Sequence, residues 1–335
     1  MKQGTIRIDD LEQLIAGILK SFRMYAPVAD GGGVALSELK KGQSPLLDYH
    51  GLKKPIKELF FPQSETILKS EGDALKSVPV REEKRIVFGI RPCDARALQQ
   101  MDSVFADGEY RDPYYTARRR DTLILSLACR EPQDICFCTS IGGGPFDERG
   151  SDVLMFKDAD TLLFQACSSA GTSFLTEFND HFKRPTAVLT ETRKKAVAKA
   201  RKKSLRFKGE RLFDRLDGSL EPAFWDTLAW RCLGCAVCTY LCPTCHCFTF
   251  SDQSSTDGGE RSRNWDACSL ELFTREASGH NPRSSKGQRI KQRIMHKFRY
   301  AKENFGDTFC VGCGRCISNC PVNMDIREII GGIIQ

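Results

Sequence analysis

Two copies of one cysteine pattern lie in the last third of this 335-residue chain. Both have the spacing C-x2-C-x2-C-x3-C followed by proline, and they occupy residues 232–243 and 310–321. This spacing is typical of ferredoxin-type modules, which bind [4Fe–4S] clusters through cysteine thiolates. One such run is also compatible with a zinc site, but two runs with the same internal spacing favour an electron-transfer module.

The spacing also predicts which cysteines share a cluster. In proteins with two such runs, the fourth cysteine of each run ligates the cluster that is held mainly by the other run. The first predicted ligand set is therefore Cys232, Cys235, Cys238 and Cys320. The second predicted ligand set is Cys310, Cys313, Cys316 and Cys242.

The remaining composition fits a metalloprotein of a reducing compartment. The chain has sixteen cysteines, a polar start, and no apolar stretch long enough to cross a bilayer. Cysteines in such a chain serve metals rather than disulfides. We therefore expect a cytoplasmic protein without membrane insertion, in a cell that tolerates oxygen-labile clusters.

Residues 1–225 predict an α/β domain, because helical and extended patterns alternate along them. The first helix is expected at residues 11–22, capped by Asp10. Strands are expected at 24–29, 85–90, 122–127, 152–156 and 161–165, with helices at 95–105 and 172–182. The strongly basic segment 191–215 is interpreted as a solvated helix face and linker, with a docking surface as the alternative.

Residues 226–335 are predicted to form a mostly helical, α-helical ferredoxin-like domain with two [4Fe–4S] clusters. Sixty-seven residues separate Cys242 from Cys310, which is more than a compact ferredoxin needs. The insertion contains a basic helical pattern at 289–300. These features favour clusters held between helices over the small β-α-β ferredoxin.

A third cysteine group lies in the first domain. We call it the N-terminal thiol group, and it consists of Cys93, Cys129, Cys136 and Cys138. Cys93 and Cys129 each follow a predicted strand, so two strand-end loops can bring the thiols together at one edge of a sheet. Tetrahedral sulfur ligation suits either iron–sulfur or zinc. We predict a third [4Fe–4S] cluster here, with zinc or unligated buried cysteines as the alternatives.

Four cysteines remain. Cys245, Cys247 and Cys268 are interpreted as alternative ligands or as neighbours that tune a cluster through hydrogen bonds to sulfur. Cys167 has no neighbouring cysteine and is expected to be a packed thiol. The three histidines that could act as ligands are expected to occupy surface or satisfied interior positions; they are His246, His280 and His296.

Common catalytic and nucleotide-binding patterns are absent from the sequence. The glycine-rich segments 31–33 and 142–144 lack the strand–GxGxxG–helix context of a dinucleotide site and are expected to be turns. There is no GxSxG, HExxH or Walker A pattern. We therefore expect no flavin or NAD(P) site and no catalytic residues in this chain.

Several of these motifs together resemble one protein family. They are RPCDARAL at 91–98, Cys129 with CFC at 136–138, CPTCHCF at 242–248, WDAC at 265–268, GHNPR at 279–283, and His296-Lys297 before CVGCGRC at 310–316. The chain resembles the iron–sulfur β subunit of cytoplasmic sulfhydrogenases and the A subunit of anaerobic sulfite reductase. The resemblance covers most of the chain and is weakest before residue 55 and at 170–225. It supports grouping the four cysteines of the N-terminal thiol group.

The resemblance implies an electron relay. In that family the subunit passes electrons between a flavin- and NAD(P)-binding reductase subunit and a terminal redox partner of hydrogenase, sulfite reductase or heterodisulfide reductase type. One alternative is direct reduction of sulfur or disulfide at a cluster with an open coordination position. Another is nucleic-acid binding by the basic segment, which the scarcity of interleaved aromatic residues disfavours.

Overall fold

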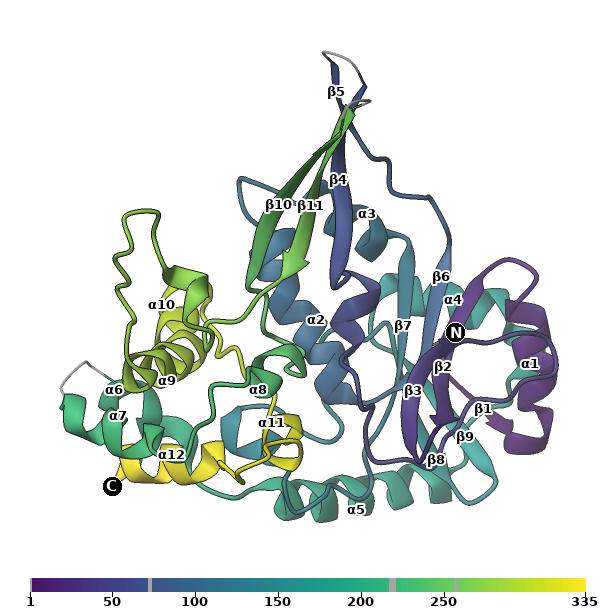
Figure 1. Ribbon diagram of the computed structural model, residues 1–335. Helices are drawn as coiled ribbons and strands as arrows, with labels where there is room; N and C mark the ends of the chain where they lie inside the picture. Colours follow the sequence, from purple (N-terminus) through teal and green to yellow (C-terminus); the bar gives the residue numbers. More distant parts are fainter. Residues whose placement is uncertain (1, 72–73, 217–220, 256–257) are drawn as a thin grey trace. The chain divides into compact units, whose positions relative to one another are not determined.

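The computed structural model describes residues 2–71, 74–216, 221–255 and 258–335 (Figure 1). The chain forms two compact units. Unit 1 comprises Met1–Ile56, Glu82–Lys208 and Val311–Cys313, and unit 2 comprises Lys57–Arg81, Gly209–Cys310 and Gly314–Gln335. This division does not coincide with a single boundary near residue 225, because Lys57–Arg81 contributes strands to unit 2.

Unit 1 is built on a seven-stranded sheet in the order β1-β9-β8-β7-β6-β2-β3. Its strands are β1 (Gln3–Arg7), β2 (Arg23–Asp30), β3 (Gly33–Glu38), β6 (Arg85–Ile90), β7 (Thr122–Leu127), β8 (Val153–Asp158) and β9 (Thr161–Ala166). The strands β2, β6, β7 and β8 pair in parallel, and antiparallel partners extend both edges. The five strands expected from the sequence are confirmed, whereas β1 and β3 were missed.

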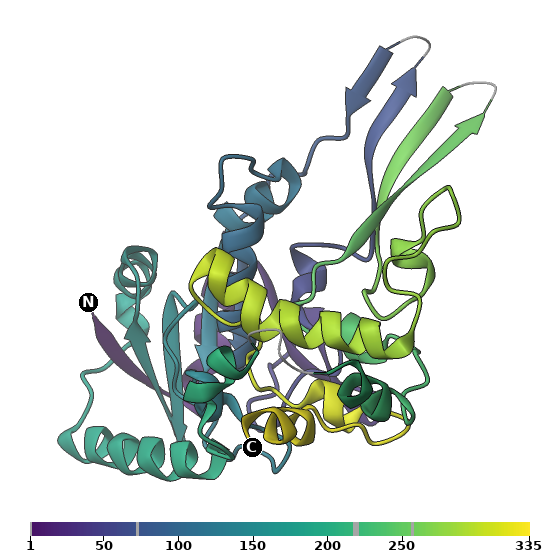
Figure 2. The same cartoon turned by 90° about the vertical axis from the view of Figure 1, so that its left-hand side faces the viewer.

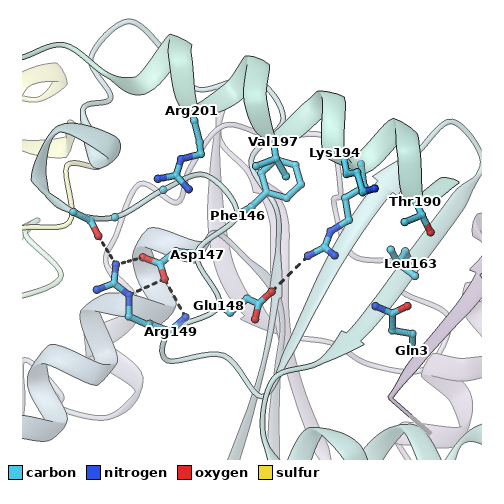
Figure 3. A pocket seen from close by; sticks show the side chains of 14 residues that line it. Gln3, Phe146, Asp147, Glu148, Arg149, Leu163, Thr190, Lys194, Val197 and Arg201 are labelled. Atoms are coloured by element: carbon cyan, nitrogen blue, oxygen red, sulfur yellow. Dashed lines mark hydrogen bonds and ion pairs between the residues drawn. The ribbon is translucent and has the colours of Figure 1, made fainter. Parts of the chain in front are cut away.

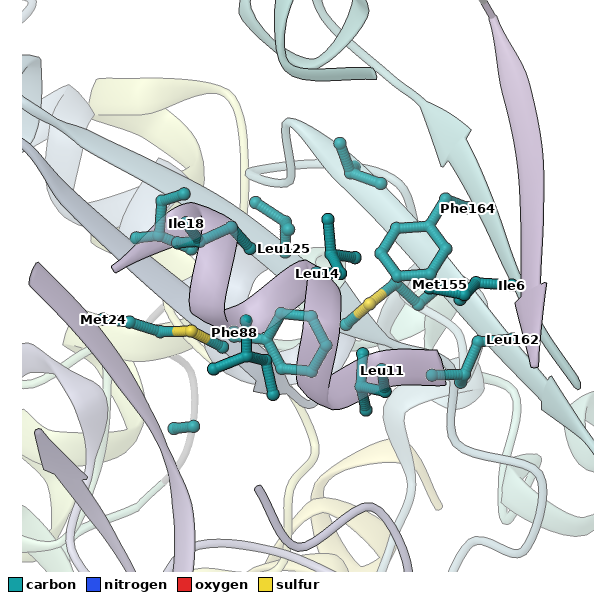
Figure 4. Close-up of a cluster of buried hydrophobic side chains, with 14 of the residues drawn as sticks. Ile6, Leu11, Leu14, Ile18, Met24, Phe88, Leu125, Met155, Leu162 and Phe164 are labelled. Carbon is teal, nitrogen blue, oxygen red and sulfur yellow. The ribbon is translucent and has the colours of Figure 1, made fainter. Parts of the chain in front are cut away.

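Five α-helices accompany this sheet. They are α1 (Leu11–Ile18), α2 (Pro92–Phe105), α3 (Pro113–Arg120), α4 (Ser169–Glu177) and α5 (Ala187–Ser204). Leu11, Leu14 and Ile18 on one side of α1 lie among buried residues of the sheet, including Phe88 and Leu125 (Figure 4). Burial of one such side chain contributes about 1.5–3 kcal/mol. This apolar cluster therefore fixes α1 against the sheet.

Two helix predictions in unit 1 need correction. The first helix ends at Ile18 rather than at residue 22, because the chain turns there to enter β2. Asp10 occupies the N-cap position, but its side chain accepts no capping hydrogen bond. The helix predicted at 172–182 begins earlier, where Ser168 caps α4, and ends at Glu177 before a short 3-10 turn.

Unit 2 contains a four-stranded antiparallel sheet in the order β10-β11-β4-β5. The strands are β4 (Ser64–Glu71), β5 (Ala74–Ser77), β10 (Phe248–Ser255) and β11 (Gly258–Trp265), and they form a long, narrow sheet (Figure 1, Figure 2). The hairpin β10–β11 lies in the insertion between the cysteine runs. The domain was expected to be mostly helical, and this hairpin adds a small sheet that the sequence did not indicate, because β10 and β11 complete a ladder with β4 and β5, which lie far away in sequence.

The rest of unit 2 is helical. Its helices are α6 (Leu212–Arg215), α7 (Pro222–Ala229), α8 (Val237–Tyr240), α9 (Lys286–Met295), α10 (Ala301–Phe305), α11 (Arg315–Ser318) and α12 (Ile326–Ile334). The basic helical pattern predicted at 289–300 is confirmed as α9, which continues as a π-helical turn at His296–Tyr300. Ser285 and Gln288 form a capping box at the start of α9. Among the described residues, none belongs to a helix long and apolar enough to cross a membrane.

Candidate metal centres

The two cysteine runs share one backbone conformation. Gly234 and Ala236 have φ angles of 73° and 63°, and the matching Gly312 and Gly314 have φ angles of 63° and 76°. A short helix begins directly after the second of these residues in each run: α8 follows Ala236, and α11 follows Gly314. Positive φ turns the chain sharply and aims consecutive cysteines toward one centre. The duplication in sequence is therefore also a duplication in local structure.

All four cysteines of the first ligand set line one cavity of unit 2, and Cys316 lines it too. Two backbone amides point at sulfurs of this set. The Gly234 amide donates to Cys232 Sγ at 3.4 Å, and the Met324 amide donates to Cys320 Sγ at 3.2 Å. Such N–H···S bonds stabilise negative charge on sulfur and raise the reduction potential of a bound cluster.

The second ligand set is divided between the units, because Cys313 belongs to unit 1 and its other three members to unit 2. Cys242 contacts a buried lysine: Lys297 Nζ donates to Cys242 Sγ at 3.2 Å, to Thr244 Oγ1 at 3.1 Å and to the Phe309 carbonyl at 3.0 Å. Burial opposes the charge of Lys297, but the cysteines Cys242, Cys245 and Cys310 together raise its pKa. The lysine is thus held as a cation against sulfur.

The N-terminal thiol group starts at the carboxyl ends of two neighbouring parallel strands. Cys93 lies in the first turn of α2, directly after β6, and Cys129 follows β7. Between them, the Arg91 guanidinium donates to the carbonyls of Leu127 and Ala128 at 3.3 and 3.1 Å. This clamp joins the two strand ends, as expected for parallel strands whose carboxyl ends meet at one sheet edge.

Three thiols of this group lie within electrostatic range of one another. Burial raises the pKa of Cys136 and of Cys138 to about 11, and it also raises the pKa of Cys129. The charges of neighbouring cysteines add to each of these increases. Ligation to a metal would remove the protons from these thiols.

The loop with Cys136 and Cys138 packs against the second cysteine run inside unit 1. The Phe137 amide donates to the Gly312 carbonyl at 2.9 Å, and Cys136 Sγ lies 4.0 Å from the Cys313 carbonyl oxygen. No sequence pattern predicts this contact, because the two loops are about 175 residues apart along the chain. One cysteine of the second ligand set is thereby placed beside the N-terminal thiol group.

The last three ligand candidates form what we call the hairpin thiol group: Cys245, Cys247 and Cys268. Cys247 precedes β10 and Cys268 follows β11, and the Asp266 amide donates to the Cys247 carbonyl at 2.9 Å, so the hairpin holds these two cysteines together. A hydrogen bond from Cys247 lowers the pKa of Cys268 to about 6. Cys242 and Cys245 form a second thiol pair, in which the hydrogen bond lowers the pKa of Cys242.

Two of the three histidines are buried near these thiols. The rings of His246 and His296 lie edge to face, with centroids 5.3 Å apart. Burial lowers the pKa of His246 to about 3 and that of His296 to about 4, so both are neutral at physiological pH. Cys167 stands apart and is half-buried, with its thiol donating to the Gln165 carbonyl at 3.5 Å.

The comparison with known proteins identifies the family. Residues 231–324 match the family model of the 4Fe-4S dicluster domain. Over 312 residues the chain is 31% identical to Sulfhydrogenase 2 subunit beta of Pyrococcus furiosus, an alignment that covers 92% of this chain and 91% of the relative. The chain belongs to the sulfhydrogenase β-subunit family. The resemblance inferred from the cysteine motifs is thus confirmed, and the dicluster domain implies two [4Fe–4S] clusters.

The donor chemistry of unit 2 fits the clusters of a sulfhydrogenase β subunit. Thiols are the usual ligands of iron–sulfur clusters. The amide donors at Cys232 and Cys320 and the cation at Cys242 are those expected around anionic sulfur. No group of three or more His, Cys, Asp or Glu side chains within the described ranges is arranged around a single-ion position.

The basic helix α5 of this β-subunit homologue lines an open pocket of about 560 Å³ in unit 1, together with the turn after Cys138 (Figure 3). Its cations are largely paired. Arg193 bonds to Gln165 and lies 3.6 Å from Glu148, and Arg149 on the opposite wall pairs with Asp147. Gly142 ends the 3-10 turn at φ 75°, which confirms the glycine-rich segment as a turn. The pairing favours a solvated helix face over an anion-binding site.

We expect Gly312→Ala to destabilise the contact between the two cysteine loops. A Cβ at this position would lie 2.5 Å from the Cys138 amide nitrogen, so the loops would have to separate. Overpacking of this kind costs about 1–3 kcal/mol. The matched control is Gly306→Ala, which shares a positive φ (76°) but meets no atom within 4 Å. Thermal unfolding that shows equal losses for both variants would contradict the prediction.

Proposed function

We propose that this chain is the electron-transfer subunit of a cytoplasmic multi-subunit oxidoreductase. It relays electrons between a flavin- and NAD(P)-binding reductase subunit and a terminal redox partner of hydrogenase, sulfite or sulfur reductase, or heterodisulfide reductase type. Its relative in Pyrococcus furiosus is, by name, one subunit of a sulfhydrogenase. Membership in this family supports assembly with further redox subunits.

The contact between Cys136 and the Cys313 carbonyl carries the proposal. We propose that the N-terminal thiol group holds a third [4Fe–4S] cluster, which this contact would place next to the cluster of the second ligand set. Clusters exchange single electrons with little rearrangement, and electrons pass readily only between centres that lie close together. A chain of neighbouring centres serves a relay, whereas a storage ferredoxin needs no such order.

The residues around the sulfurs favour reduction of bound clusters. A [4Fe–4S] cluster with four thiolates is anionic, and each added electron increases that charge. Arg293 and Lys297, which are 8% and 3% exposed, face these sulfurs and lower the cost of the added charge. The net charge of +7 acts in the same direction and attracts an acidic partner.

The first ligand set provides an exit toward the terminal subunit. Cys235 is exposed, and the nearby Trp230 and Leu233 are 90% and 61% exposed. An exposed tryptophan beside a redox centre is well suited to protein contact, because tryptophan is enriched among the residues that dominate binding energy. We infer that the terminal redox subunit docks at this surface.

We expect Trp230→Ala to weaken docking without loss of iron. Truncation of an interface tryptophan costs at least about 2 kcal/mol when it is a dominant contact, equivalent to a roughly 30-fold weaker complex. The matched control is Leu272→Ala, which removes another exposed apolar side chain (73% exposed) from unit 2. The measurement is the affinity for the co-purified terminal subunit. Equal affinities for the two variants would argue against this docking surface.

The relay is tested on the isolated chain. We expect it to be inert with NADH and NADPH, to be reduced by dithionite, and to be reoxidised by an artificial acceptor. Addition of the flavin-containing partner subunit from the native complex should make cluster reduction depend on NAD(P)H. Stoichiometric flavin in the purified chain, together with turnover of NADH, would show that the chain is an enzyme in its own right and not an electron-transfer subunit.

The direct reduction of sulfur or disulfide is the second candidate. The hairpin thiol group favours it. A [4Fe–4S] cluster bound by its three cysteines would have one iron without a cysteine ligand, and sulfur or disulfide could bind there. The test is sulfide release from sulfur by the dithionite-reduced chain without partners. Activity at a rate comparable to that of the native complex would support this candidate over the relay.

A further inference from the structure

The hairpin thiol group is assembled by secondary structure rather than by local spacing. The ladder of β10 and β11 begins with the pair Phe248 and Trp265, so the chain segments that continue from this pair emerge side by side. Cys247 and Cys268 lie on these segments and form a hydrogen-bonded thiol pair. Cys245, two residues before Cys247, is within electrostatic range of it. The three cysteines therefore form a single group in unit 2, in which Cys268 is buried and the other two are partly buried.

Three buried basic side chains lie close to this group, and one of them contacts a sulfur of it directly. Lys57 Nζ donates to the Cys245 carbonyl at 2.7 Å and lies 4.1 Å from the centre of the Trp265 ring. Arg293 Nη1 lies 3.6 Å from Cys245 Sγ, and Lys297 Nζ contacts the neighbouring Cys242. Their exposed fractions are 2% for Lys57, 8% for Arg293 and 3% for Lys297.

None of these three cations forms an ion pair with a carboxylate of the described chain. A buried charge without a counter-charge is strongly destabilising, typically by several kcal/mol. The acceptors that they contact are carbonyls, hydroxyls and cysteine sulfurs. Only the sulfurs can supply full negative charge. The burial of these three cations is thus explained if the thiols are present as thiolates bound in an anionic centre.

We propose that Cys245, Cys247 and Cys268 ligate a further iron–sulfur cluster, distinct from the two clusters of the cysteine runs and from the N-terminal thiol group. Cys242 is assigned to the second ligand set, so the new cluster has three cysteine ligands. Each thiol releases its proton when it binds iron. The net negative charge of the centre is balanced by Lys57, Arg293 and Lys297.

A cluster with three cysteine ligands differs chemically from its neighbours. One iron of a [4Fe–4S] cube then carries a ligand that is not cysteine and is lost most easily. Mild oxidation therefore converts such a cluster to the [3Fe–4S] form, and ferrous iron with a reductant restores it. The fully cysteine-ligated clusters of the two runs lack this easily exchanged iron.

The main test compares the full-length chain with the variant Cys245→Ser/Cys247→Ser/Cys268→Ser, both purified without oxygen. We expect the variant to lose about four iron and four sulfide per chain, the content of one cube. The other EPR signals should remain. Cys167→Ser is the matched control, because it removes a half-buried thiol that lies outside all the proposed groups. Unchanged iron in a folded triple variant, or loss of zinc in place of iron, would overturn the proposal.

A second measurement decides the matter if the triple variant does not fold. The native chain is oxidised mildly and followed by EPR, together with the isosteric single variant Cys247→Ser. We expect a reversible [3Fe–4S] signal in the native chain and none in the variant. The same signal in both proteins, or in neither, would refute the three-cysteine cluster. Neither outcome affects the relay, whose clusters are assessed by NAD(P)H-dependent reduction with the partner subunit.

Discussion

Cys235→Ser should remove one whole cluster, with the loss of about four iron atoms and four sulfides per chain. Cys235 belongs to the first ligand set, whose four cysteines line one cavity. Serine keeps the size of the side chain but replaces the thiolate that iron prefers. Because cluster binding and folding are coupled, we also expect lower thermal stability around α8 and α12.

Iron and acid-labile sulfide analysis of the anaerobically purified chain provides the measurement. Cys167→Ser serves again as the control and should retain the full iron content. The EPR signal that disappears in Cys235→Ser should differ from any signal lost in Cys136→Ser, which affects the N-terminal thiol group. Full retention of iron in Cys235→Ser would show that the first ligand set is wrongly assigned.

A second large effect is expected at a buried ion pair in the sheet of unit 2. Arg263 on β11 and Glu65 on β4 lie opposite each other, with side chains 4% and 8% exposed. The Arg263 guanidinium also lies 4.8 Å from the centre of the Phe61 ring. Removal of one partner leaves a buried charge, so Glu65→Ala should destabilise this ladder by about 3–5 kcal/mol.

Native-state hydrogen exchange of the amides in β4 and β11 measures this effect locally. The double variant Glu65→Leu/Arg263→Met removes both charges and should recover most of the loss. The matched control lies in the same sheet: Asp252 and Arg261 form an exposed pair at 2.7 Å. Asp252→Asn should change stability by less than about 1 kcal/mol. Similar effects of Glu65→Ala and Asp252→Asn would show that burial is not decisive here.

Local patterns predicted much of unit 1. The strands β6 and β7 were found within their correct bounds, because continuous apolar runs between turn residues are typical of buried parallel strands. The edge strands β1 and β3 were missed. They are half-exposed in part, and their pairing with β9 and β2 depends on segments that periodicity in a short window does not reveal.

Unit 2 was predicted less completely. The basic amphipathic pattern of α9 identified that helix, whereas the hairpin β10–β11 was missed. Its strands are rich in polar and charged residues, and their stability depends on pairing with β4, which lies about 190 residues earlier. Segments of this kind have no strong intrinsic preference, since cross-strand contacts supply most of the stabilisation.

The two cysteine runs and the family that they indicate were recognised from local sequence patterns. Ligand spacing within a run is local, and the chain can present three thiols only by turning where Gly234 or Gly312 allows it. The contacts between groups that are distant in sequence became visible only in the folded chain. The β10–β11 ladder brings Cys247 and Cys268 together, and the fold of unit 2 brings Lys57 to the Cys245 carbonyl. These contacts follow from long-range strand pairing and from the need to balance buried charge, and neither is encoded in a short stretch of residues.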